Sequence, residues 1–508
     1  MVFLPKAASG EDPELGTYFK PGETRPLSIV NCDNRLVANA MRLRWEEHIN
    51  LFVKDRQQGF LKGRSLIKDL LEIESAMILR SVDDPDAAAV FLDFASAFPS
   101  ISQEYIMESL ARAGIPTEMR NAFGALYYEN KCNVSVKGGV FGGFSMHSGV
   151  RQRCPLSPLV YALVAEDLLD MIDDLIPGCF TRAYADDTAL VLQDFWVAAP
   201  ALVKIFTDWR AVSGLRLNMT KSIIIPLNSR KVDTFAERLR CDAAGWEDMS
   251  VNTTCKYLGF YVGPGKSDLS WKKPMDKFKE RVSMWKDQPL GLFSDARVFN
   301  TFAIPILSFV AQLEDPPEWV MQGIETSLRK VAKGPGKWAS PKDLWTLKEA
   351  FGMQASFQNL EWIAQAAKIR VICSDPACQP HRRFWADFNR LKMTIDCPGD
   401  GFPNWIWMSW YRNSFVLTVG RAYNRAMELC NSVDAVKVSR VASPKLASAD
   451  HIWKNNANPL FTTCSSPPPW MTHGIGCDTS CPGGSSKLFT RLPGSTRWRG
   501  AQTEPLGC

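Results

Sequence analysis

The sequence predicts an α+β protein: a domain built on an antiparallel sheet, then a mostly helical region and a Pro/Ser/Gly-rich tail. Helix-spaced apolar residues alternate with short strand-like runs up to residue 263, and Trp-rich helical periodicity continues to residue 433. Beyond that point apolar periodicity is lost, which favours disorder. The expected segments are a lead-in over residues 1–22, the α+β domain over 23–263, the helical region over 264–433 and the tail over 434–508.

Local patterns predict the elements of the α+β domain. A helix is expected over residues 31–50, and Ser65 is a suitable N-cap for the next helix. The apolar run from Ala87 to Asp93 is typical of a strand buried on both faces. The remaining elements are a helix from about Ser102, a hairpin around 132–146, a helix over 157–175 capped by Ser157, a hairpin over 180–192 and a helix over 200–212.

Composition restricts the class of protein. A chain of 508 residues exceeds the size of one hydrophobic core, and a net charge of +5 does not by itself indicate a nucleic-acid partner. The 14 cysteines are scattered, which favours reduced thiols and an intracellular location, with nucleus and cytoplasm as the candidate compartments. No window is apolar enough for a membrane span, so no membrane partner is expected.

Three aspartates form the clearest candidate site. Asp186 and Asp187 are adjacent on a predicted turn between two strands, and Asp93 ends the buried apolar run. Alone, the Asp-Asp pair would be an ordinary hairpin turn. With Asp93, the carboxylates can hold two divalent ions about 4 Å apart, as required for attack of a hydroxyl on a nucleoside triphosphate. The pattern therefore predicts a nucleic-acid polymerase that uses two Mg²⁺ ions, with Mn²⁺ as a substitute.

Phe98 follows Asp93 by five positions and is a candidate for sugar discrimination. A bulky ring beside the incoming sugar would clash with a 2′-hydroxyl, the group that distinguishes RNA precursors from DNA precursors. An isolated Phe is more often a core residue. If Phe98 faces the nucleotide, it favours DNA as the product over RNA.

Seven motifs in one order resemble the reverse transcriptase of non-LTR (LINE-type) retrotransposons. The resemblance covers roughly residues 21–263 and is weaker in the helical region beyond. Its strings are RPLSIVN (25–31), QGFLKGRS (58–65), FLD with AF (91–93, 97–98), GVRQ with CPLSP (149–152, 154–158), YADD (184–187), SGLRLN with KS (213–218, 221–222) and YLG (257–259).

The resemblance implies a right-hand polymerase with fingers, palm and thumb, and it implies a role for each matched residue. The metal-binding carboxylates would be Asp93, Asp186 and Asp187, and Lys221 would protonate the departing pyrophosphate. Residues that would meet the nucleotide are Arg25, Lys62, Arg64, Phe98 and Gln152. The primer grip would be Tyr257, Leu258 and Gly259, with backbone and ring both positioning the primer end. Basic residues of a following helix would grip the template–primer backbone: Lys272, Lys273, Lys277 and Lys279.

The implied partners are an RNA template, a DNA primer or target, and deoxynucleoside triphosphates. Three features depart from the family pattern. Arg153 stands where glycine is usual, a basic residue is missing at Ser96 and an acidic one at Pro99. The endonuclease module that usually lies upstream is also missing from this chain. The alternative hypothesis is therefore a catalytically decayed fragment, or an adopted nucleic-acid-binding protein, with the same fold.

Overall fold

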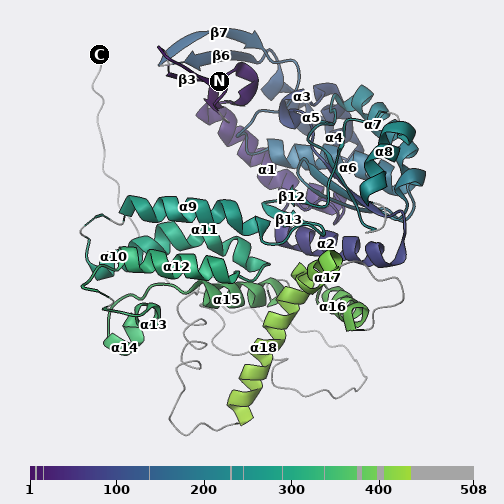
Figure 1. The fold of residues 1–508 in the computed structure, drawn as a ribbon. Helices are drawn as coiled ribbons and strands as arrows, with labels where there is room; N and C mark the ends of the chain where they lie inside the picture. Colours follow the sequence, from purple (N-terminus) through teal and green to yellow (C-terminus); the bar gives the residue numbers. More distant parts are fainter. Residues whose placement is uncertain are drawn as a thin grey trace, which may run out of the picture. The chain divides into compact units, whose positions relative to one another are not determined.

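The α+β class is confirmed (Figure 1). The computed structural model describes residues 1–435 except 6–7, 15, 137, 229–231, 244, 286, 289, 337, 374–379 and 397–404. The tail predicted over 434–508 lies outside the described residues, apart from residues 434 and 435, which belong to the last described helix. Within the described part, no helix has the length and apolar character needed to cross a membrane.

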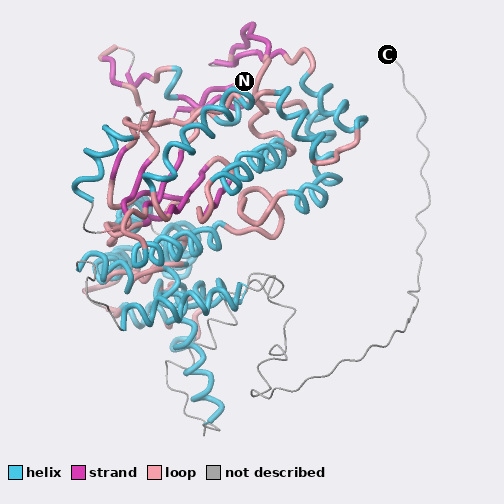
Figure 2. The backbone as a smooth tube through the Cα atoms, turned by 90° about the vertical axis from the view of Figure 1, so that its right-hand side faces the viewer, coloured by secondary structure: helices cyan, strands magenta, loops and turns pink. Residues whose placement is uncertain are grey.

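A five-stranded sheet with the order β11-β10-β5-β9-β8 organises the first half of the chain. Strand β5 pairs antiparallel with both of its neighbours, so that Leu92 lies opposite Thr188 and Phe91 lies opposite Ile223. Figure 2 shows these strands with helices on both sides. The strands are β5 (Ala88–Leu92), β8 (Phe180–Tyr184), β9 (Asp187–Leu192), β10 (Ile223–Pro226) and β11 (Ser250–Val251).

Both faces of this sheet are covered by hydrophobic cores. On β5, Val90 and Leu92 point into one core, whereas Ala89 and Phe91 point into the other. This alternation follows from the two-residue period of a strand. Every residue of β5 is buried, so the strand predicted from the apolar run is confirmed.

Five helices of the first half agree with the sequence patterns, whereas α3 (Ala97–Ser100), α5 (Thr117–Tyr127) and α8 (Val232–Asp242) were not predicted. Ser65 caps α2, because its Oγ accepts a hydrogen bond from the Ile67 amide at 3.2 Å. The predicted cap at Ser157 is wrong: Leu156 is the N-cap and Ser157 is the first helical residue. These helices are α1 (Cys32–Phe52), α2 (Leu66–Asp83), α3 (Ala97–Ser100), α4 (Gln103–Arg112), α5 (Thr117–Tyr127), α6 (Ser157–Leu175), α7 (Phe195–Ser213) and α8 (Val232–Asp242).

The expected lead-in is more ordered than its composition indicates. Its first strand pairs antiparallel with β4 and also joins β6 through Val2 and Ser135, giving a sheet of order β4-β1-β6-β7. The first four strands were missed because each is only three or four residues long, whereas the β6–β7 pair is the hairpin predicted around residues 132–146. The elements of this region are β1 (Val2–Pro5), β2 (Gly10–Asp12), β3 (Gly16–Tyr18), the 3-10 turn η1 (Pro21–Glu23), β4 (Thr24–Leu27), β6 (Lys131–Val136) and β7 (Gly139–Ser145).

The second half begins with a small hairpin and continues as helices. Figure 1 shows α9 lying beside α11 and α12. The elements are β12 (Cys255–Tyr257), β13 (Phe260–Val262), α9 (Leu269–Trp285), α10 (Leu292–Val298), η2 (Phe299–Ala303), α11 (Ile304–Ser308), η3 (Val310–Gln312), α12 (Glu318–Val331), α13 (Pro341–Trp345), α14 (Leu347–Phe351), α15 (Leu360–Cys373), α16 (Pro380–Asp396), α17 (Trp405–Arg412) and α18 (Phe415–Ala435).

A buried ionic contact joins the two halves. Glu74 on α2 is 1% exposed, and its Oε1 lies 2.6 Å from the Nζ of Lys266, which is 3% exposed. The same oxygen accepts a hydrogen bond from Trp410 Nε1 at 3.0 Å, and Oε2 accepts one from the Phe415 amide at 2.6 Å. One carboxylate therefore ties α2, the segment after β13, α17 and the start of α18 together.

We expect Glu74→Ala to lower the free energy of unfolding by about 3–5 kcal/mol, because it leaves the Lys266 ammonium buried without its partner. Urea unfolding followed by circular dichroism measures this loss. The exposed Glu280→Ala on α9 is the control and should change stability by less than about 0.5 kcal/mol. Equal effects of the two substitutions would show that the Glu74 contact does not join the halves.

Candidate active site

The sheet brings the three predicted aspartates to one edge. Asp93 directly follows β5, and the β8–β9 hairpin turns through Ala185 and Asp186. Leu92 lies opposite Thr188, so continuing this register places Asp93 opposite Asp187. Antiparallel pairing thus gathers carboxylates that are far apart in the sequence.

The three aspartates lie close enough for their charges to affect the ionisation of Asp186 and Asp187. Burial and the nearby Asp186 and Asp93 carboxylates raise the pKa of Asp187 to about 6. Burial and the Asp93 carboxylate also raise the pKa of Asp186. The cluster is therefore held together against its own repulsion, as expected of a site for cations.

The donor set suits a hard divalent ion that shares its coordination with substrate. Among the described residues, no group of three or more His, Cys, Asp or Glu side chains could hold a metal ion by itself. Mg²⁺ does not need such a group, since it keeps several waters and binds through one or two carboxylates together with substrate phosphates. Asp93, Asp186 and Asp187 fit this mode of binding.

Lys221 lies beside the cluster, with its Nζ 3.9 Å from Asp93 Oδ2. Its segment is pinned to the end of β5 by backbone contacts: the Asn218 amide donates to the Asp93 carbonyl at 2.7 Å, and Ala95 donates to Arg216 at 2.9 Å. The Lys221 side chain is exposed, so its ammonium is available to a ligand at the aspartates.

Phe98 lies close to the aspartates through Tyr161. The Phe98 and Tyr161 rings stack with centroids 4.9 Å apart and an interplanar angle of 13°. Tyr161 is buried, and both burial and the charges of Asp186 and Asp187 raise its pKa. Phe98 remains partly exposed, as contact with a nucleotide would require.

Gln152 is brought to the same region. Two residues before it, the Val150 amide donates a backbone hydrogen bond to the Phe98 carbonyl at 2.8 Å. Gln152 itself is partly buried in the turn before α6. The next residue, Arg153, is exposed and has φ 68°, the left-handed region that glycine adopts readily. The substitution of the usual glycine therefore places Arg153 in a strained backbone conformation.

A residue that the sequence reasoning missed supports the catalytic turn. Gln57 is fully buried; its Oε1 accepts from the Ala185 amide at 2.9 Å and its Nε2 donates to the Ala185 carbonyl at 3.3 Å. Ala185 has φ 62°, so Gln57 stabilises an otherwise unfavourable backbone conformation next to Asp186. The adjacent QGFLKGRS motif was the available signal, but the partner of Gln57 could not be read from it.

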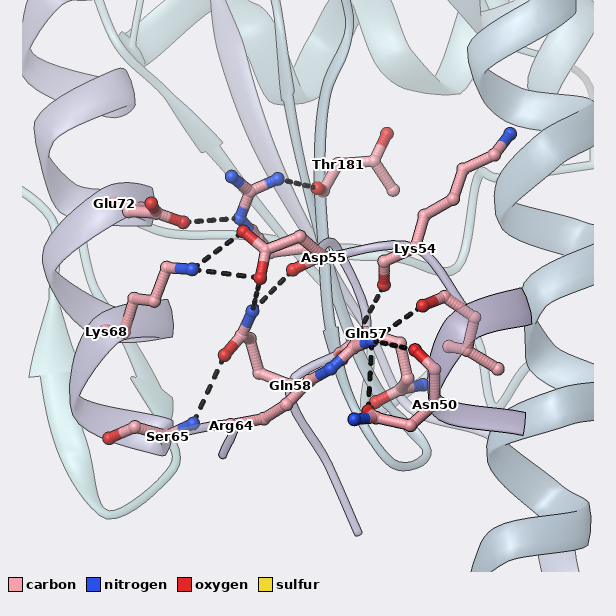
Figure 3. Close-up of polar contacts among 12 residues, drawn as sticks. Asn50, Lys54, Asp55, Gln57, Gln58, Arg64, Ser65, Lys68, Glu72 and Thr181 are labelled. Carbon is pink, nitrogen blue, oxygen red and sulfur yellow. Dashed lines mark hydrogen bonds and ion pairs between the residues drawn. The ribbon is translucent and has the colours of Figure 1, made fainter. Parts of the chain in front are cut away.

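Arg64 is used differently from the sequence-based expectation. Its guanidinium donates to the carbonyls of Val53 and Gln57, both at 2.6 Å, and also to that of Lys54 (Figure 3). These bonds satisfy carbonyls at the end of α1 and fix the loop that carries Gln57. Arg64 is therefore a brace for the loop, and the predicted direct contact with the triphosphate is not supported.

The two other predicted basic contacts are solvent-exposed. Lys62 lies at the tip of the same loop between α1 and α2, where it is free to meet a ligand. Arg25 lies on β4, an edge strand of the N-terminal sheet, and is also exposed. The loop itself is held by Lys68, whose Nζ lies 2.7 Å from Asp55 Oδ2.

Tyr257, Leu258 and Gly259 form the turn of the β12–β13 hairpin. Leu258 and Gly259 have φ 47° and 93°, as in a tight two-residue connection. The Tyr257 ring is 4% exposed and packs against Phe91, with ring centroids 5.2 Å apart, so the ring faces the core. The role of the Tyr257–Gly259 segment as a primer grip stays a prediction.

The predicted basic helix is α9. One face is buried through Trp271, Met275 and Phe278. The predicted backbone-binding residues are all exposed on it: Lys272, Lys273, Lys277 and Lys279. Asp276 and Glu280 are exposed on the same helix, so its surface is mixed in charge.

Comparison with known proteins shows which family this chain belongs to. Residues 6–262 match the family described as reverse transcriptase (RNA-dependent DNA polymerase). Because the match spans half of the chain, the chain belongs to this family, and the prediction made from its motifs is confirmed.

The curated relatives are proteins of mobile elements. The chain is 26% identical to the transposon TX1 149 kDa protein of Xenopus laevis, over 48% of this chain and 19% of that protein. It is 25% identical to the retrovirus-related Pol polyprotein of the type-1 element R2 of Popillia japonica, over 49% of this chain and 37% of that protein. The chain thus corresponds to less than half the length of either relative.

Similarity to solved structures is more distant. Apo telomerase from Candida tropicalis is 11% identical, with a TM-score of 0.37 over 80% of this chain and 60% of that chain. A likeness at this level does not support residue-by-residue comparison.

We expect Gly59→Ala to disturb the catalytic turn, because a Cβ at this position would lie 2.3 Å from the Ala185 backbone nitrogen. The strain should cost about 1–3 kcal/mol of stability and lower any nucleotide transfer by about tenfold or more. Thermal unfolding and primer extension measure the two effects. Gly142→Ala is the matched control, since a Cβ there would meet no atom within 4 Å and the position has no left-handed φ. Native activity in Gly59→Ala would contradict the close approach of Gly59 to the Ala185 backbone.

Proposed function

We propose that this chain is an RNA-directed DNA polymerase of a non-LTR retrotransposon, which adds deoxynucleotides to a primer 3′ hydroxyl on an RNA template. The observation that carries the proposal is the gathering of Asp93, Asp186 and Asp187 at one sheet edge in a chain of the reverse transcriptase family. The mobile-element relatives support the choice of element class.

Asp93, Asp186 and Asp187 would hold two Mg²⁺ ions, which lower the pKa of the primer hydroxyl and neutralise the triphosphate when bound. Lys221, exposed beside Asp93, donates a proton to the departing pyrophosphate. Gln57 and Arg64 keep the catalytic turn and the neighbouring loop in place. Phe98, stacked on Tyr161, excludes the 2′-hydroxyl of a ribonucleotide.

The proposed division into parts follows the elements. The loop at Lys62 with α1 and α2 would form the fingers, the five-stranded sheet the palm, and the helices from α9 onward the thumb and C-terminal region. The Leu258–Gly259 turn would position the primer end, and the exposed lysines of α9 would contact template–primer phosphates without sequence preference. The matching portions of the relatives are only part of longer proteins, so an endonuclease supplied elsewhere fits the proposal.

One observation favours a second candidate function. Arg153 occupies a backbone conformation suited to the glycine usual at that position, directly after Gln152. A chain that kept the fold but lost turnover would act as a nucleic-acid-binding protein. The two candidates share the same site and differ in whether nucleotide transfer occurs.

Primer extension on an RNA template with Mg²⁺ and deoxynucleotides tests the proposal. We expect synthesis by the native chain and loss of at least about a thousandfold in Asp186→Ala, since one metal carboxylate is gone. Asp208→Ala, an exposed aspartate on α7, should retain native activity. Synthesis that survives Asp186→Ala would refute the metal site, whereas silence of the native chain with template–primer binding retained would favour the second candidate.

We expect Arg153→Gly to raise the free energy of unfolding by about 1 kcal/mol, because it relieves a left-handed backbone conformation. Glu129→Gly is the control, since Glu129 has φ 46° in a turn away from the aspartates. Both variants should gain stability in urea unfolding. A gain in primer extension confined to Arg153→Gly would show that this side chain limits turnover. Equal rates in Arg153→Gly and the native chain would show that it does not.

A further inference from the structure

A buried hydrogen-bonded chain connects α2, the β12–β13 hairpin and the catalytic hairpin. Asp69 on α2 is fully buried, and its Oδ2 accepts a hydrogen bond from the Tyr257 hydroxyl at 2.8 Å. The same hydroxyl lies 3.4 Å from the backbone carbonyl oxygen of Asp187. Tyr257 begins the turn that continues through Leu258 and Gly259.

We infer that Asp69 is a positioning residue for primer extension: it holds the Tyr257–Gly259 turn in register with the Asp186–Asp187 hairpin through the Tyr257 hydroxyl. This inference rests on the proposed function, because it assigns the turn to the primer end and the hairpin to the metals. Asp69 itself touches neither substrate nor metal.

The hairpin depends on its contacts with the rest of the domain. Its two strands have only three residues each, and a two-stranded hairpin of this size is marginal on its own. Tyr257 packs on Phe91 with the ring planes tilted by 55°, but such an apolar contact is non-directional and leaves the ring some freedom to rotate or slide. A directed hydrogen bond at the far end of the ring removes that freedom.

Helix α2, which carries Asp69, is itself held in place by ion pairs. Helix α2 is tied to β8 by Glu72, whose Oε2 lies 2.7 Å from Arg182 Nε. It is tied to the segment after β13 by Glu74, whose Oε1 lies 2.6 Å from Lys266 Nζ. Asp69 therefore links the β12–β13 turn to a helix that is itself fixed to the sheet. Through this link the turn is held in place relative to Asp186 and Asp187.

The neutral carboxyl form also suits this chain of contacts. Burial raises the pKa of Asp69 to about 7, and its Oδ1 has no hydrogen-bond partner among the described residues. When Asp69 is protonated, it can donate to the Tyr257 oxygen, and the tyrosine can then donate to the Asp187 carbonyl oxygen 3.4 Å away. Asparagine can make the same contacts, because its amide both donates and accepts.

Single-turnover primer extension with a radiolabelled primer tests the inference, with template–primer affinity measured separately by filter binding. We expect Asp69→Ala and Tyr257→Phe each to lower the maximal rate about tenfold, while affinity for template–primer changes by less than about twofold. Asp69→Asn should stay within about twofold of the native rate. The double variant Asp69→Ala/Tyr257→Phe should be no slower than the slower single variant, because both act through one contact.

The matched control is Tyr105→Phe, which removes an equivalent tyrosine–carboxylate bond of 3.1 Å to Asp167 between α4 and α6. It should cost less stability, because Asp167 keeps its bonds from Ser109 and Arg112, and it should leave the maximal rate unchanged. Native rates in Asp69→Ala and Tyr257→Phe, or an equal rate loss in Tyr105→Phe, would overturn the inference. If Asp69→Ala does not fold, Tyr257→Phe decides alone, since it removes a single oxygen atom.

Asp186→Ala, run in the same assay, separates this inference from the proposed function. Loss of synthesis in Asp186→Ala with native rates in Tyr257→Phe would leave the polymerase assignment standing and remove only the role of Asp69. Full synthesis in Asp186→Ala would remove the proposed function itself, and the inference with it.

Discussion

Three acidic side chains on α2, two buried and one partly buried, tie the helix to the segments that surround the site. Asp69 holds the β12–β13 turn, Glu72 holds Arg182 on β8, and Glu74 holds Lys266 together with the start of α18. Burying carboxylates on one helix is costly unless each finds a partner. Because each of the three acids has a partner from a distant segment, α2 can pack in only one way, and the sheet edge that carries the aspartates is fixed by that packing.

Backbone strain is concentrated around the same sheet edge. Seven described residues other than glycine have positive φ. Five of them lie within or beside a motif that resembles the family: Phe60, Ser96, Arg153, Ala185 and Leu258. The other two are Glu129 and Ser267. Such conformations cost about 1–3 kcal/mol each and persist only where the surroundings impose them. The Gln57 amide imposes one of them at Ala185, and the tight β12–β13 connection imposes another at Leu258. The site is thus assembled from short turns whose shapes are dictated by contacts outside the turns.

This origin explains what could be predicted from the sequence. Strand β5, the α2 cap at Ser65 and the carboxylate cluster depend on local patterns, so they were predictable. Gln57, Asp69 and Glu74 were missed because their partners lie more than a hundred residues away and no local signal names them. Arg64 and the Tyr257 ring were assigned to ligands, yet one braces backbone carbonyls and the other is buried. A motif preserves the residue type but does not say whether its side chain faces the ligand or the core.

The contact between Glu74 and the Phe415 amide spans 341 positions of sequence, and it has a consequence for how the chain matures. A polypeptide leaving the ribosome presents α2 long before α17 and α18 exist, so Glu74 must wait for Trp410 and Phe415 while already surrounded by apolar side chains. Closing so long a loop is slow, because its entropy cost precedes the reward of the contact. Maturation of the domain is therefore completed from its C-terminal helices, and a nascent chain that stops before residue 415 leaves the Oε2 atom of the buried Glu74 without its hydrogen bond.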